Sequence, residues 1–241
     1  MNITAFWDTA DRTSRRELWA AWFERLREPS LTLLVGLQAL VIFVVEPLEA
    51  MRILPGFLIG ILTVATVCIV LVLASANRWA QAAIILSALI DGASWVLSYV
   101  DPSLPALAID FVGRLIFFIA VSAILLHVIF GDEDGTYHRI QGGIAVYLNI
   151  ALVFAFLYRI ADLIDPHAFR MLAGTASSDL SRFIYFSLAT LTTTGYGDVV
   201  PVNPLVRSAA NLESLIGQLF TVTLLARLVS LYFASARKSG S

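Results

Sequence analysis

The sequence has few charged residues. Of its 241 residues, 14% are charged and 59% are hydrophobic, whereas a soluble domain carries about 25% charged residues. This deficit excludes an ordinary soluble domain, and the hydrophobic excess excludes a disordered chain, which needs the opposite composition. The excess is too large for one anchor helix, so it predicts several membrane spans of about 20 apolar residues each.

Cysteine, histidine and lysine are also scarce. Cys68 is the single cysteine and lies in a long apolar run, so we expect a small buried side chain rather than a disulfide or a zinc ligand. Only Lys238 among the 16 basic residues is a lysine, and no basic run is present, which argues against a nucleic-acid partner. No Ser/His/Asp grouping, metal cluster or phosphate-binding loop is evident, so neither an enzyme nor a cofactor is predicted.

Six long apolar segments predict six transmembrane helices in an all-α membrane protein. They lie at about 30–46, 53–74, 79–100, 104–130, 142–162 and 207–233. The first is expected to end at Glu46-Pro47, and a further apolar segment, 182–191, is too short to span a membrane. The N-terminal tail holds five arginines and the first outer loop only Arg52, which predicts that both termini are cytoplasmic.

The chain divides at the edges of these segments. Residues 1–29 form a polar cytoplasmic tail, in which 14–26 predict an amphipathic helix that lies on the membrane surface or packs on the rest of the protein. A four-helix transmembrane domain is expected at 30–130 and a cytoplasmic linker at 131–141. Residues 142–241 hold the last two spans and the short apolar segment between them.

The stretch Thr-Thr-Thr-Gly-Tyr-Gly-Asp, at Thr192–Asp198, is the candidate functional segment of the sequence. Gly195 and Gly197 permit positive φ, so the strand can turn successive carbonyl oxygens to one side, where they replace the water shell of a cation. Non-helical backbone at membrane depth is tolerated only if it is buried in protein or lines a water-filled cavity. A short helix at 182–191 would direct the partial negative charge of its C-terminus at such a cation.

This stretch resembles the filter signature of tetrameric potassium channels, Thr-(Val/Thr)-Gly-Tyr-Gly-Asp, which is present at Thr193–Asp198. The flanks are similar too: Phe183–Ser187 resembles the family's pore helix, and Leu212–Leu219 with Ala226–Val229 resembles the inner helix of bacterial six-span members. The resemblance covers about 142–233. It implies a pore domain at 142–241 and a homotetramer in the plasma membrane, which is the inner membrane of a bacterium, with four filter segments around K⁺ ions.

The resemblance also implies roles for single residues. Thr193 would give a carbonyl and a hydroxyl oxygen to the innermost ion site, Thr194, Gly195 and Tyr196 would give carbonyl oxygens, and Gly197 would shape the outer mouth. Tyr196 would pack against Tyr185 and Phe186. Asp198 and Thr192 would also support the filter. Many family members have a bracing glutamate where this chain has Ala189, which puts slow filter inactivation in doubt but not selectivity.

A gate is expected on the last span. Gly217 is interpreted either as a hinge or as a point of close packing. The cytoplasmic end of this helix carries bulky residues that would close the pore by hydrophobic constriction. The gate candidates there are Leu225, Leu228 and Tyr232.

The fourth span lacks the ladder of basic residues that voltage sensing needs, because it holds only Arg114. Strong voltage gating is therefore not expected. Asp110 lies four residues before Arg114, so the two share a helix face, and Arg114 pairs either with it or with Asp91. We interpret these charges as a structural pair or, less simply, as part of a sensor.

Two histidines offer a second sensing hypothesis. His127 is near the cytoplasmic end of the fourth span, and His138 follows the acidic run Asp132–Asp134. They either sense cytoplasmic pH or belong to a solvated linker. The sequence as a whole predicts a passive potassium-selective channel. The alternatives are a non-selective cation channel and a channel-like receptor or scaffold that does not conduct.

Overall fold

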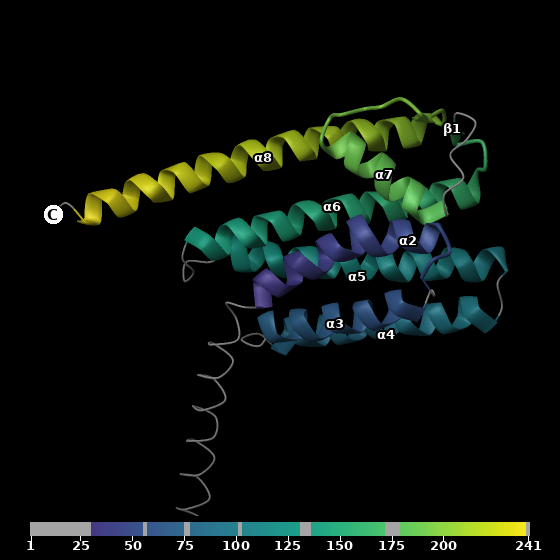
Figure 1. Ribbon diagram of the computed structural model, residues 1–241, viewed down its shortest axis with the longest axis horizontal. Coiled ribbons are helices and arrows are strands. Elements are labelled where there is room, and N and C mark those ends of the chain that lie inside the picture. Colours follow the sequence, from purple (N-terminus) through teal and green to yellow (C-terminus); the bar gives the residue numbers. More distant parts are fainter. Residues whose placement is uncertain are drawn as a thin grey trace, which may run out of the picture.

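The computed structural model describes residues 30–54, 57–74, 78–100, 103–130, 136–171 and 179–239. The predicted amphipathic helix of the N-terminal tail lies outside these ranges. Most of the described chain is helical, and Figure 1 shows most of the helices running side by side along the long axis of the molecule. This arrangement agrees with an all-α membrane protein.

The first helix runs from Ser30 to Ala50 and crosses the point where the sequence predicted its end. It contains a π-helical turn, η1 (Val41–Val45), followed by α2 (Glu46–Ala50). Pro47 stands in the first turn of α2, and the wider turn of η1 before it changes the backbone hydrogen-bond pattern there. The predicted end at Glu46-Pro47 is therefore wrong.

Four more long helices follow: α3 (Phe57–Leu73), α4 (Arg78–Val100), α5 (Leu104–Phe130) and α6 (Thr136–Ile164). α3 has 17 residues, or about 26 Å at 1.5 Å per residue, against a membrane core of about 30 Å. In the described part of the chain, five helices are long and apolar enough to cross a membrane, so the sixth predicted span is not confirmed. α6 begins at Thr136, inside the predicted 131–141 linker.

The C-terminal part contains a short helix and a small sheet. β1 (Phe169–Met171) pairs antiparallel with β2 (Val199–Pro201), and α7 (Asp179–Leu191) lies between them in sequence. α7 is too short to span, as predicted. α8 (Pro204–Ser239) is longer than the predicted 207–233, and Figure 1 shows that its C-terminal end projects beyond the other helices.

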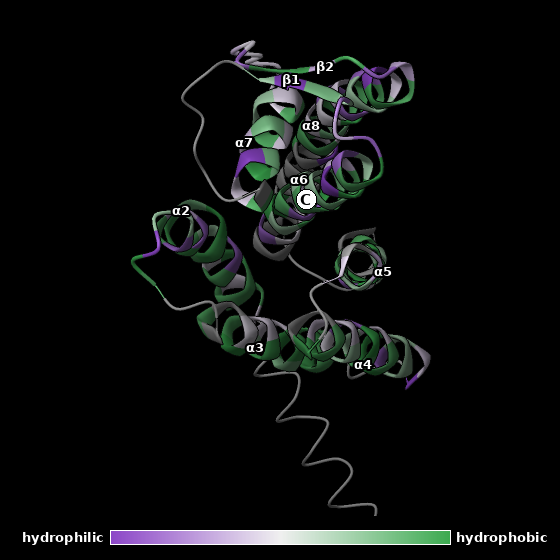
Figure 2. Ribbon diagram, turned by 90° about the vertical axis from the view of Figure 1, so that its right-hand side faces the viewer, coloured by the Kyte–Doolittle hydropathy of each residue, from purple (hydrophilic) through white to green (hydrophobic). Residues whose placement is uncertain are grey.

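Two clusters of buried hydrophobic side chains hold the helices together. One joins α6, α7, α8 and the sheet, with Tyr158, Phe169 and Phe183 among its members. The other joins the first helix, α3, α4 and α5 to the start of α6. α5 connects the two clusters, because the ring of its Phe118 lies 5.5 Å from the ring of Phe156 on α6. Figure 2 shows α5 between the helices of the two clusters.

The helices differ in how much of their surface the chain itself covers. In the most apolar stretch of α6, 61% of the residues are buried, whereas in that of α8 only 11% are. α6 is thus the centre of the C-terminal unit, and the described chain leaves most of the surface of α8 uncovered. Cys68 is exposed on α3, so the prediction of a buried thiol is wrong. Among the described residues, α3 packs mainly on α4 and the first helix, which leaves part of its surface, including Cys68, uncovered.

Candidate functional site

α7 is anchored in the core and delivers the Thr192–Asp198 segment. Phe183, Ile184 and Ser187 are buried on one side of the helix. Its last carbonyl groups all find donors in the chain, as a helix end requires. Leu188 O accepts from Thr192 N, Ala189 O from Thr194 N and Gly195 N, Thr190 O from Thr193 N, and Leu191 O from the Tyr147 hydroxyl. The segment therefore starts from a fixed point.

Every second residue of the segment has a positive φ. The values are 59° at Thr193, 56° at Gly195 and 79° at Gly197. The glycines confirm the sequence-based expectation. Thr193 was not anticipated, because a β-branched side chain rarely adopts this conformation and such outliers concentrate at functional sites. Alternation of this kind turns successive carbonyl groups in a common direction.

The carbonyl oxygens of this segment are unused. Within the described ranges, no hydrogen bond ends on the carbonyl oxygens of Thr193 to Tyr196, whereas the N–H groups of Thr193, Thr194 and Gly195 are bonded to α7. Residues 192–197 are all exposed. In Figure 1 the segment leaves α7 and runs back along α8 toward the sheet. A single chain thus presents a row of free acceptors on its surface.

Tyr196 is held by one of its two predicted neighbours. Its ring stacks on that of Tyr185, with centroids 5.6 Å apart and planes inclined by 13°. Phe186 instead points into the core, where its ring lies 5.0 Å from that of Tyr158, so the predicted contact with Tyr196 within the chain is wrong. Adjacent helix positions differ by about 100° in direction, which is why Tyr185 and Phe186 face different partners. Asp198 accepts a hydrogen bond from the Val199 N–H.

One face of α8 supports the start of the segment. Ser214 Oγ donates to the Thr190 carbonyl and Gln218 Nε2 to Thr193 Oγ1, each at 3.3 Å. A Cβ atom on Gly217 would lie 2.3 Å from the Leu191 carbonyl oxygen. The structure therefore favours close packing over a hinge at Gly217. The sequence did not predict these roles of Ser214 and Gln218, because their partners Thr190 and Thr193 lie on a different element, far from them in the sequence.

Of the gate candidates, Leu225 lies on α8 and is 62% exposed. Leu228 and Tyr232 also lie on α8, but their side chains fall outside the described part of the chain. The gate hypothesis therefore stays a prediction.

A buried carboxyl group links α8 to α6 and α7. Glu213 is fully buried, and its Oε2 accepts a hydrogen bond of 2.6 Å from the Tyr158 hydroxyl. Its Oε1 contacts Ser187 Oγ, which also lies 2.8 Å from the Ala151 carbonyl oxygen. Ser187 has one hydrogen for two acceptors, so a protonated Glu213 that donates to Ser187 completes the set of bonds.

Sequence reasoning overlooked Glu213, although a signal was available. It is the only acidic residue of α8, and an ionisable residue within a membrane span is a functional candidate by default. The structure places Glu213 against Ser187 of α7, the same helix that carries Ala189 where an acid was looked for.

Of the predicted sensing residues, Asp110, Arg114 and His127 lie on α5 and His138 lies near the start of α6. Arg114 Nε is 3.2 Å from Asp110 Oδ2, so the i,i+4 pairing is the one present rather than the pairing with Asp91. The side chains of His127 and His138 lie outside the described part of the chain. Within the described ranges, no group of three or more His, Cys, Asp or Glu side chains is placed to hold a metal ion.

Comparison with known proteins identifies one region. Residues 115–234 match a family model described as an ion channel. No curated protein and no solved structure matches the chain. The matched region holds α6, α7, the exposed segment and most of α8, and it extends further toward the N-terminus than the resemblance noted from the sequence. Residues 115–234 are thus similar to an ion channel domain, and the five long apolar helices agree with a multi-pass membrane protein.

Proposed function

We propose that this protein is a subunit of a homotetrameric, potassium-selective channel that conducts K⁺ passively and without strong voltage gating. The observation that carries the proposal is the segment 192–198, in which positive φ alternates along the backbone and the carbonyl oxygens are left without donors. Rings of backbone carbonyls are how K⁺ channels replace the hydration shell of the ion. The resemblance of Thr193–Asp198 to the potassium-channel filter supports the same assignment.

The exposure of the segment supports assembly. One segment supplies oxygens to one side of an ion only, and residues 192–197 lie on the surface of the single chain. Rotation of four copies about a common axis would bring four such segments together. The uncovered surface of α8, with Leu215, Leu219 and Val222 each more than half exposed, supplies apolar area for the contacts between copies.

The fixed position of Tyr196 supports selectivity over a non-selective pore. The ring of Tyr196 stacks on Tyr185 of α7, and α7 is itself anchored by Ser187 and the surrounding aromatic rings. A segment held at its side chain and at its N–H groups keeps its carbonyl oxygens at a defined spacing. The non-selective alternative would need a looser segment.

The proposal of weak voltage dependence rests on the charged residues of α5. Arg114 is the only basic residue between Leu104 and Phe130 and is paired with Asp110, whereas voltage sensors carry several gating charges. We place both termini in the cytoplasm and the protein in the plasma membrane, because of the arginine-rich N-terminal tail.

The decisive experiment is ion flux through purified protein reconstituted in liposomes. We expect K⁺ flux well above Na⁺ flux, blocked by Ba²⁺, and equal fluxes would overturn the selectivity claim. Gly195→Ala should abolish selective flux, since the residue has a φ of 56° that a side chain strains. Gly36→Ala is the matched control, because the first helix leaves open space at Gly36. Selective flux from Gly195→Ala, or a protein that is not a tetramer, would contradict the proposal.

A further inference from the structure

The first four helices line most of an open cavity that the conduction mechanism does not use. It measures about 1320 Å³ and lies mainly between the first helix, α3, α4 and α5, which is room for a drug-sized ligand. Its lining comes from one end of the bundle, where the first helix ends and α3 begins. By the topology proposed above, this is the outer half of the membrane.

The cavity carries more acids than bases. Four carboxyl groups line it, those of Glu46, Glu49, Asp91 and Asp110, against the guanidinium groups of Arg114 and Arg159. Both arginines already have acidic partners, since Arg114 pairs with Asp110 and Arg159 lies 2.8 Å from Asp162 Oδ2. Among the described residues, no ion pair is formed by Glu46, Glu49 or Asp91. The lining therefore has two more acidic than basic side chains.

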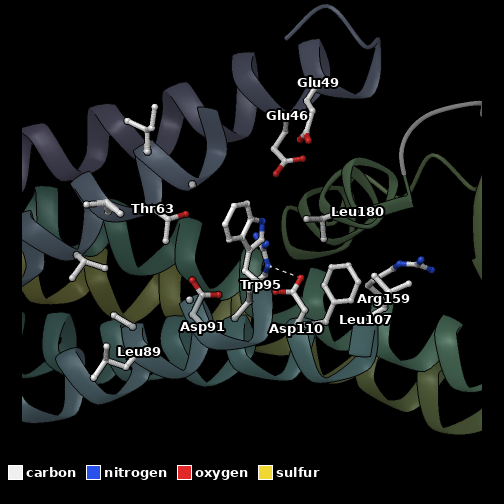
Figure 3. Close-up of a pocket in the computed structure, with 18 of the residues that line it drawn as sticks. Glu46, Glu49, Thr63, Leu89, Asp91, Trp95, Leu107, Asp110, Arg159 and Leu180 are labelled. Carbon is white, nitrogen blue, oxygen red and sulfur yellow. Dashed lines mark hydrogen bonds and ion pairs between the residues drawn. The ribbon is translucent and has the colours of Figure 1, made fainter. Parts of the chain in front are cut away.

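Among these acids, Asp91 combines deep burial with an oxygen atom that lacks a hydrogen-bond donor. Its side chain is more than nine-tenths buried, and its Oδ1 atom has no hydrogen-bond partner within the described ranges. Figure 3 shows Asp91 and Asp110 on one wall, Glu46 and Glu49 on the opposite wall, and Trp95 between them. A buried carboxylate oxygen without a donor is costly, so the site is arranged for a ligand that brings a donor and a positive charge.

The rest of the lining is apolar and aromatic. Trp95 and Phe111 contribute aromatic surface, and Leu89 and Leu107 contribute aliphatic surface. The guanidinium group of Arg159 already lies 5.5 Å from the centre of the Phe111 ring, a cation–π contact. A bare metal ion does not fit these walls, because hard cations need six to eight oxygen ligands. The walls instead suit a ligand with a charged head and an apolar body.

We propose that this cavity binds an amphiphilic organic cation, whose ammonium group donates to Asp91 and whose apolar body lies against Trp95 and Phe111. The ligand would enter from the outer half of the membrane. Its position against α5 and near Leu180 of α7 places it next to the ion channel domain.

The test is direct binding to the purified full chain in a non-ionic detergent. The probe is dansylcadaverine, a primary ammonium joined to an apolar fluorophore, and the matched neutral probe is dansylamide. We expect saturable fluorescence enhancement with dansylcadaverine and at least tenfold weaker binding of dansylamide. Asp91→Asn should weaken dansylcadaverine binding about tenfold, whereas Asp165→Asn, outside the cavity, should leave it unchanged.

A second pair of variants tests the place of binding. Gly92 lines the cavity and has open space at its Cβ position, as does Gly36 outside the cavity. Gly92→Leu should fill the cavity and remove saturable binding, whereas Gly36→Leu should not. If Gly92→Leu does not fold, Gly60→Leu fills the same cavity from α3. Unchanged binding in the folded cavity variant, or equal binding of both probes with no effect of Asp91→Asn, would overturn the proposal. Because no flux is measured, failure here is separate from failure of the proposed channel function.

Discussion

Two buried carboxyl groups, Glu213 of the C-terminal unit and Asp91 of the first four helices, have opposite surroundings. Glu213 is fully buried and contacts two hydroxyl groups, from Tyr158 and Ser187. Asp91 is nearly as buried, yet one of its oxygens has no donor within the described ranges and borders a large cavity. The first acid joins three helices into a rigid support, and the second leaves an open position for a ligand.

The packing around each acid explains the difference. α6, α7 and α8 meet closely around Glu213, so side chains from two neighbouring helices reach it. α4 faces the first helix across the cavity, so Glu46 and Asp91 lie on opposite walls with Trp95 between them (Figure 3). Burial alone therefore does not say what a membrane carboxyl group does; the supply of donors around it decides.

The largest expected effect is that of removing the carboxyl group at Glu213. Glu213→Ala leaves two buried hydroxyl groups without their partner and opens a hole, which should cost about 3 kcal/mol of unfolding free energy. Glu213→Gln keeps a donor and an acceptor, so it should stay close to the parent. The melting temperature in detergent and the K⁺/Na⁺ flux ratio measure both variants. If the glutamine variant is as damaged as the alanine variant, Glu213 acts through its charge and not through the bonds described above.

The next largest effect is expected at Gly217, which packs on the end of α7. In Gly217→Ala the new methyl group would lie 2.3 Å from the Leu191 carbonyl oxygen, so α7 and the segment after it must shift, at about 1–3 kcal/mol. K⁺ selectivity should fall together with thermal stability. Gly143→Ala offers a comparison, since there only the flexible end of Leu224 must give way. A Gly217→Ala protein with normal stability and normal flux would contradict the close packing of Gly217 on Leu191.

Asp91→Asn should have a much smaller effect on stability than Glu213→Ala. The substitution removes a buried carboxyl group that forms no ion pair in the described chain, so the melting temperature should stay the same or rise, within about 1 kcal/mol. A clear loss of stability would mean that Asp91 is already satisfied and would remove the contrast with Glu213.

The smallest effect concerns Asp165, a carboxylate that is paired but lies at the surface. Asn203 Nδ2 and the His167 N–H donate to it and hold its pKa below the ordinary value of 3.8. A lowered folded-state pKa means that the stabilisation is present above that ordinary value and is lost as the pH falls further. Melting temperatures between pH 6 and 3 should therefore fall less in Asp165→Asn than in the parent. Parallel curves would show that the Asp165–Asn203 link contributes nothing.

Features set by neighbouring residues could be predicted from the sequence. Runs of apolar residues located the helices, the length of 182–191 excluded a span there, and the glycines at 195 and 197 gave the positive φ values. The i,i+4 spacing gave Asp110 as one of two candidate partners of Arg114, and it is the one present in the structure. Each of these features depends on residues a few positions apart.

Features set by tertiary packing could not be predicted. Tyr158, Ser187 and Glu213 meet across three helices, and the sequence carries no mark of that meeting beyond a lone acid in an apolar helix. Gly217 was open to two interpretations until the Leu191 carbonyl was found beside it. Cys68 was misjudged because exposure in a membrane protein follows from which helices touch, and the cavity exists only once four helices are in place.

α8 is a single unbroken rod from Pro204 to Ser239. Its first half touches the end of α7 through Ser214, Gly217 and Gln218, and its far half projects past the bundle. A continuous helix of this kind has no flexible break that could absorb a tilt of its free end. Movement of the projecting end must therefore strain the Leu191 contact, so that the two ends of α8 act as one mechanical unit.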